Sequence, residues 1–122
     1  MYLGIRSVIY PAPDIAAARD WFTSALGIEP YFDEPFYVGF NLGGYELGLE
    51  AGASVKDGPI SYWGVDSVDV ALDELLEAGA VARGDVLDLG DGLRMATVTL
   101  PNNGGIFGVI ENPHFASPGP GQ

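Results

Sequence analysis

The fold is decided by residues 5–27, which read IRSVIYPAPDIAAARDWFTSALG. The first eight of these residues, 5–12, are rich in β-branched and aromatic side chains, which is typical of a strand, and Pro11 and Pro13 mark its end. Asp14 then has the side chain of a helix N-cap, and apolar residues recur at helical spacing after it. Gly27 ends this pattern, because glycine readily adopts the left-handed conformation that closes a helix. The segment therefore predicts a strand followed by a helix.

Three extended segments follow this helix. They lie near residues 30–33, 35–42 and 45–51, and the last two are separated by the dipeptide Gly43-Gly44. A two-residue glycine loop between alternating segments is a hairpin signal. Together with the first strand and helix, these segments predict a βαβββ unit.

The same order then repeats. Residues 60–65 have strand character, Ser67 is a second N-cap candidate, and the apolar face that follows it ends at Gly79. Both halves also end in a similar string, GYELGL at 44–49 and GGIFGV at 104–109. Three further strands are predicted after the second helix, near residues 81–88, 93–100 and 105–111.

These observations predict one domain over residues 1–122, built from two modules. Module 1 spans about 3–52, a turn-rich linker about 53–59, module 2 about 60–113, and a tail 114–122. Neither module is expected to be stable alone, because each sheet needs a partner to cover its apolar face. A chain of this length buries a sufficient core without disulfides, and it contains no cysteine.

The charge balance excludes several classes of partner. Seventeen acidic residues oppose five basic ones, which gives a formal charge of −12. Nucleic acids and anionic membrane surfaces both require a basic footprint, so neither is expected as a partner. The absence of cysteine excludes a thiolate zinc site and a cysteine nucleophile. No leader pattern and no run of about 20 apolar residues is present, which predicts a cytoplasmic protein.

The two βαβββ units, the helix at 14–27 and the ending FGVIENP at 107–113 resemble the vicinal oxygen chelate superfamily. This superfamily includes glyoxalase I, extradiol dioxygenases and bleomycin-resistance proteins. The resemblance implies an α+β fold, in which two tandem βαβββ modules form a curved mixed sheet. One face of that sheet would pack on the helices and the other would line a cup. The resemblance also implies a homodimer.

The resemblance also implies where a metal ion would be held. The family uses one position in the first strand of each module and one in the last, and these are usually His, Gln or Glu. In this chain the four positions are Ser7, Ile60, Gly48 and Gly108. Isoleucine and glycine have no donor and a serine hydroxyl is weak, whereas a catalytic divalent site needs about three protein ligands. We therefore predict no metal ligands and no divalent-metal cofactor.

The cup face supplies the candidate ligand site. Side chains alternate along a strand, so Glu46 and Glu50 point the same way as Gly48. They lie roughly 13 Å apart at ~3.3 Å per residue, which is too far for two carboxylates that share a proton. With glycine at two ligand positions, the floor of the cup is expected to be open and largely apolar. The predicted ligand-binding residues are Ser7, Ile9, Glu46, Gly48, Glu50, Ile60, Tyr62, Ile106 and Gly108.

Three functions are compatible with this pattern. The first is a metal-independent protein that binds a small organic molecule, similar to the drug-sequestering bleomycin-resistance proteins, with an acidic surface that would attract a cationic ligand. The second is a glyoxalase-like lyase or isomerase, or a dioxygenase-type enzyme, with an atypical metal site or none. Its catalytic candidates are Glu46 or Glu50 as the base and Tyr62 as a polarising donor. The third is a protein-interaction module without a ligand. His114, the single histidine, is either an exposed tail residue or a cap over the pocket.

Overall fold

The computed structural model describes residues 2–113. The chain divides into two compact units, of which the first comprises residues 7–60 and the second comprises residues 2–6 and 61–113. The predicted tail at 114–122, with His114, lies outside the described residues. The boundary between the units falls inside the first strand, so the two compact units do not coincide with the two sequence modules.

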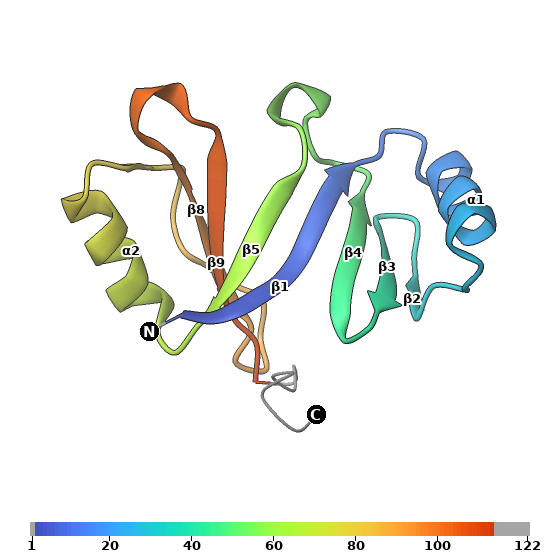
Figure 1. Ribbon diagram of the computed structural model, residues 1–122, viewed down its shortest axis with the longest axis horizontal. Helices are drawn as coiled ribbons and strands as arrows, with labels where there is room; N and C mark the ends of the chain where they lie inside the picture. Colours follow the sequence, from blue (N-terminus) through green and yellow to red (C-terminus); the bar gives the residue numbers. More distant parts are fainter. Residues whose placement is uncertain (1, 114–122) are drawn as a thin grey trace. The chain divides into compact units, whose positions relative to one another are not determined.

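The first unit is a four-stranded sheet with one helix. Its sheet order is β2-β3-β4-β1, where β1 pairs with β4 in parallel and the other neighbours are antiparallel. The helix α1 packs on β3 and β4 (Figure 1). The elements are β1 (Tyr2–Pro11, from residue 7 on in this unit), α1 (Ile15–Leu26), β2 (Phe32–Asp33), β3 (Tyr37–Leu42), β4 (Tyr45–Glu50) and the 3-10 turn η1 (Val55–Asp57).

The helix ends of the first unit confirm the predicted caps. The Asp14 side chain accepts a hydrogen bond from the backbone N–H of Ala17. Gly27 is left-handed, with φ of 72°, and its N–H donates to the carbonyl of Thr23. The buried core on this side of the sheet consists of Ala12, Val38, Phe40 and Leu49, with Ile15, Ala18, Phe22, Ile28 and Leu47 packed against it. One sheet face is thereby closed by α1, and the other face carries the candidate site.

The second unit repeats this plan. Its sheet order is β5-β9-β8-β6, with β7 also paired to β8, and β5 and β9 are parallel. Its core consists of Val65, Val68, Ala71, Ala96 and Val109, at the contact with α2. The elements are β5 (Ile60–Val65), α2 (Val68–Glu77), β6 (Val81–Ala82), β7 (Leu87–Asp88), β8 (Arg94–Thr99), the 3-10 turn η2 (Pro101–Asn103) and β9 (Ile106–Glu111).

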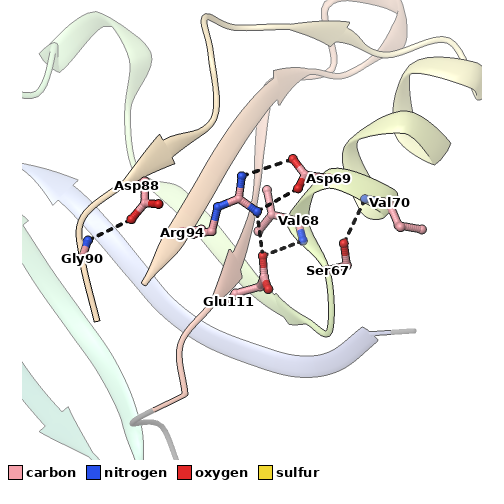
Figure 2. A network of polar contacts seen from close by, with 8 residues as sticks. All are labelled: Ser67, Val68, Asp69, Val70, Asp88, Gly90, Arg94 and Glu111. Atoms are coloured by element: carbon pink, nitrogen blue, oxygen red, sulfur yellow. Dashed lines mark hydrogen bonds and ion pairs between the residues drawn. The ribbon is translucent and has the colours of Figure 1, made fainter. Parts of the chain in front are cut away.

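Helix α2 is tied to the sheet by a polar network at its first turn (Figure 2). Glu111 on β9 accepts a hydrogen bond from the backbone N–H of Val68 at 3.0 Å, and Ser67 caps the N–H of Val70. Arg94 on β8 donates to Glu111 at 3.3 Å and to Asp69 at 2.8 Å. Negative charge at a helix N-terminus is favourable, because the first N–H groups of a helix have no partner within it. The network therefore fixes α2 against β8 and β9.

The prediction of an α+β fold with two βαβββ modules in a mixed sheet is confirmed. Several details differ from the prediction. The first strand begins at Tyr2, the linker contains the turn η1, and the predicted strand at 81–88 is two short strands. Gly84, with φ of +75°, lies between those two strands and interrupts the extended backbone. No helix in residues 2–113 has the length and apolar character to cross a membrane.

Candidate functional site

The face of the first unit opposite α1 holds five of the predicted site residues. In the register of β1 with β4, Ser7 pairs with Glu46 and Ile9 with Gly48. Residues that pair across a ladder share a sheet face, and Glu50 lies two residues beyond Gly48 on the same face. Their common face is therefore observed, and their role in ligand binding stays a prediction.

Glu46 on β4 is held by two phenols. Tyr37, from β3, donates a hydrogen bond to Glu46 Oε1 at 2.7 Å, and the hydroxyl of Tyr31 donates to Oε2. Tyr31 is itself held beside β3, because its backbone N–H donates to the carbonyl of Gly39 at 2.9 Å. Both carboxylate oxygens thus have a donor, and Glu46 has no ion pair within the described part of the chain.

The space above the glycines of this face is filled by the same side chains. A Cβ added at Gly48 would lie 2.7 Å from Tyr37 Cζ, and nearer still to the Tyr37 hydroxyl oxygen. A Cβ added at Gly39, the register partner of Gly48, would lie 2.8 Å from Glu46 Oε2 and 2.9 Å from Tyr31 Cε1. The expectation of an open floor at Gly48 is therefore wrong. The glycine makes room for the Tyr37 phenol.

The second unit shows the same arrangement at Gly108. Tyr62 on β5 is the register partner of Gly108 on β9, and its ring atoms lie 2.5 and 2.7 Å from where a Cβ of Gly108 would stand. Tyr62 is only 8% exposed. Ile106, two residues before Gly108 on β9, lies on the same face. Ile60 is the first residue of β5 and belongs to the first unit. The open floor predicted at Gly108 is thus also wrong, because the Tyr62 ring occupies it.

Burial and the Glu46 charge together keep the two phenols protonated. The pKa of Tyr37 is raised far above its ordinary value, first by desolvation and then by the negative charge and hydrogen bond of Glu46. The pKa of Tyr31 is also raised, by desolvation and by the hydrogen bond to Glu46. Both hydroxyls therefore remain donors through the neutral pH range, and Glu46 stays oriented.

Sequence reasoning missed Tyr31 and Tyr37. A signal for Tyr37 was present, because alternation along residues 35–42 puts it on the same face as Gly39, and the hairpin at Gly43-Gly44 brings that face beside Glu46. Tyr31 had no such signal. It precedes β2, a strand of only two residues, so the alternation of side chains along a strand did not assign it to the face of Glu46, with which its hydroxyl forms a hydrogen bond.

Solved structures match this chain over nearly its whole length. A glyoxalase/bleomycin resistance protein/dioxygenase superfamily member from Vibrio splendidus 12B01 matches with a TM-score of 0.68 at 18% identity, covering 88% of this chain and 99% of that one. The chain has the glyoxalase fold. A methylmalonyl-CoA epimerase variant from Streptomyces coelicolor shows this fold with a TM-score of 0.71 at 16% identity, over 97% of this chain and all of the other (100%). A structure named as an NAD-dependent benzaldehyde dehydrogenase from Legionella pneumophila has a TM-score of 0.69 at 16% identity, over 85% and 96% of the two chains.

These likenesses are structural only. No protein-family model matches the sequence, and no curated protein matches it by sequence. At 16–18% identity they establish the glyoxalase fold and leave the chemistry to be argued from the residues of this chain.

The residues at the expected metal positions of the glyoxalase fold do not fit a divalent ion. Gly48 and Gly108 have no side-chain ligand atoms, and the space that their side chains would occupy is filled by the Tyr37 phenol and the Tyr62 ring. Ile60 is apolar, and the buried Ser7 offers one hydroxyl. Among residues 2–113, no three His, Cys, Asp or Glu side chains are grouped as a metal site requires.

Two further aromatic rings lie near the tyrosines that hold Glu46. Phe32 pairs with Gly39 and so shares the face of Glu46; its ring centroid lies 6.2 Å from that of Tyr37 and 6.1 Å from that of Phe36. Tyr31 and Phe36 are each 63% exposed, and Phe32 is 40% exposed. We call Tyr31, Phe32, Phe36 and Tyr37 the aromatic cluster. It provides an accessible apolar surface beside one oriented carboxylate.

Proposed function

We propose that this protein binds a small organic molecule without a metal ion, and that the ligand contacts the aromatic cluster at Glu46. The observation that carries the proposal is the Glu46 carboxylate, oriented by the Tyr31 and Tyr37 hydroxyls and lacking an ion pair within residues 2–113. Small-molecule sites typically combine apolar and aromatic surface with a few fixed polar groups, and this face has that composition.

Preorganisation supports this proposal. A carboxylate on a flexible side chain loses rotamer freedom when it binds a ligand, at a cost of ~0.5–1.5 kcal/mol. Glu46 has already lost that freedom in the folded protein, because each oxygen is held by a phenol. Each oxygen also retains a second lone pair for a ligand donor. The arrangement suits a binding anchor.

An enzyme that moves a proton without a metal is the second candidate. Methylmalonyl-CoA epimerases are among the structures that share the fold, and Glu46 is an oriented carboxylate that a substrate on the aromatic cluster would meet. Both oxygens of Glu46 already accept a hydrogen bond from a phenol, however, whereas a general base has to take up a proton itself and release it in every turnover. The donors that hold this carboxylate are Tyr31 and Tyr37, and Glu50, the other candidate base, is exposed at the end of β4. Binding therefore ranks first.

The test is a ligand screen on metal-stripped protein. Thermal unfolding is followed with a panel of cationic, neutral and anionic aromatic compounds, for wild type, Tyr37→Phe and the control Glu29→Gln, which removes an exposed acid of the same unit. A true ligand at 100 times its Kd stabilises the folded state by about 2.7 kcal/mol. We expect this shift in wild type and Glu29→Gln, unaffected by chelator, and a smaller one in Tyr37→Phe.

Two outcomes would contradict the proposal. One is that no compound of any charge class binds. The other is that binding appears only after a divalent metal is added back.

A further inference from the structure

We infer that the ligand of this site is an organic cation with an alkylated ammonium head, held between the Glu46 carboxylate and the rings of the aromatic cluster. This inference rests on the proposed function and names the chemical class of its ligand. Tyr37 joins the two parts of the site, because its hydroxyl hydrogen-bonds Glu46 while its ring lies 6.2 Å from that of Phe32.

The charge of the face is the first support. Glu50 is the register partner of Tyr37, so two carboxylates flank that phenol, and neither Glu46 nor Glu50 forms an ion pair within residues 2–113. Arg19, a cation of the same unit, is bound to Asp20 and Asp33. An anionic ligand would be repelled here, and a cationic one would supply the missing partner.

The rings are the second support, because they select among cations. The plane of the Phe32 ring is inclined at 68° to that of Phe36 and at 58° to that of Tyr37, so these rings are not stacked face to face. A cation over an aromatic face is attracted by the negative charge of the π system. Sodium, magnesium and calcium instead require several oxygen ligands, and this face has one oriented carboxylate. A weakly hydrated ammonium with methyl or aryl substituents matches both the rings and the charge.

The experiment compares a cation with its neutral isostere. Choline and 3,3-dimethylbutan-1-ol have the same shape and differ in charge; benzyltrimethylammonium adds an aromatic ring. Each is titrated into wild-type protein and followed by NMR, with sodium and magnesium chloride as inorganic controls. We expect both ammonium compounds to shift the ring signals of Phe32 and Phe36, and the neutral isostere to bind at least about tenfold more weakly.

Variants locate the two parts of the site. Glu46→Gln keeps one acceptor oxygen for a phenol and removes the charge, so we expect about tenfold weaker binding of the cation. Phe36→Leu removes one exposed ring without touching a hydrogen bond, and we expect about a two- to fivefold loss. Glu29→Gln, which removes one exposed charge of the same unit, should bind as wild type does. Phe36→Leu keeps the test valid if Glu46→Gln does not fold.

The outcomes separate this inference from the proposed function. If the neutral isostere binds equally well and shifts the same ring signals, the inference of a cationic ligand is overturned, whereas the proposed binding site stands. Ammonium binding that ignores both Glu46→Gln and Phe36→Leu would overturn the inference. So would a concentration-dependent dimer that covers these rings and excludes the ligands, because the occupant would then be a second copy of the chain.

Discussion

Gly48→Ala tests whether the glycine exists to admit the Tyr37 phenol. The added Cβ would lie 2.7 Å from Tyr37 Cζ, closer to its hydroxyl, and 3.2 Å from Ile9 Cγ1. The phenol has to rotate away, which breaks its hydrogen bond to Glu46. Losing that bond costs ~1–1.5 kcal/mol, and an off-rotamer ring costs ~0.5–1.5 kcal/mol. The reduced freedom of the unfolded chain offsets ~0.4–1 kcal/mol of this.

The net expectation is a loss of about 1–2 kcal/mol in the free energy of unfolding. Urea denaturation measures it as a midpoint lowered by about 0.5–1 M. Gly52→Ala is the matched control, since nothing lies within 4 Å of a Cβ there and its φ is not in the positive range; it should be neutral or slightly stabilising.

A double-mutant cycle with Tyr37→Phe isolates the hydroxyl. In that background the hydrogen bond is already absent, so Gly48→Ala should cost about 1 kcal/mol less. The reasoning is refuted if Gly48→Ala is as stable as Gly52→Ala, or if its cost is unchanged by Tyr37→Phe.

Three further expectations concern stability and titration. Gly108→Ala should destabilise by more than Gly48→Ala, because the buried Tyr62 ring and a backbone oxygen at 3.0 Å both oppose the Cβ; the same urea assay ranks the two, and equal stability to wild type would contradict it. The hydrogen bond from Arg94 lowers the pKa of Asp69 below its ordinary 3.8. The contribution of the Asp69–Arg94 pair to folding stability is therefore present above pH 3.8, and it is lost as the pH falls through the lower pKa that Asp69 has in the folded protein. Folding stability, followed by circular dichroism, should fall less steeply with decreasing pH in Asp69→Asn than in wild type. The same pH dependence in both proteins would exclude this ion pair as a contributor. The pKa of Tyr37 is raised from its ordinary 10.0. The Tyr37 hydroxyl therefore contributes fully to folding stability below pH 10, and this contribution declines as the pH rises toward the pKa that Tyr37 has in the folded protein. Phenolate absorbance at alkaline pH should show one late-titrating tyrosine fewer in Tyr37→Phe than in wild type, and equal numbers in the two proteins would contradict this.

Local signals in the sequence account for the fold. The two caps, Asp14 and Ser67, accept the hydrogen bonds expected of them, because an N-cap interacts with its own first turn and needs no distant partner. The same holds for Gly27, which needs only its own left-handed backbone. The alternation of strands placed Glu46 and Gly48 on one face for a similar reason.

The contacts that make the site are not local in this sense. That Tyr37 covers Gly48 depends on the register between two strands and on the direction of a long side chain, neither of which a single strand encodes. Glu111 is another example, because its carboxylate binds the first turn of a helix that is 43 residues earlier in the chain. The floor expected to be open at Gly48 is therefore covered by Tyr37, although both strands that carry these two residues were predicted.

The strand β1 has a consequence for synthesis. Its residues 2–6 belong to the compact unit that otherwise begins at residue 61, and Tyr2 lies edge-on to Phe107 with ring centroids 6.2 Å apart. Residues 2–6 are synthesised before the rest of their unit, so the contact of Tyr2 with Phe107 forms only after residue 107 has left the ribosome. A bulky amino-terminal fusion would accordingly disturb the carboxy-terminal half of the molecule.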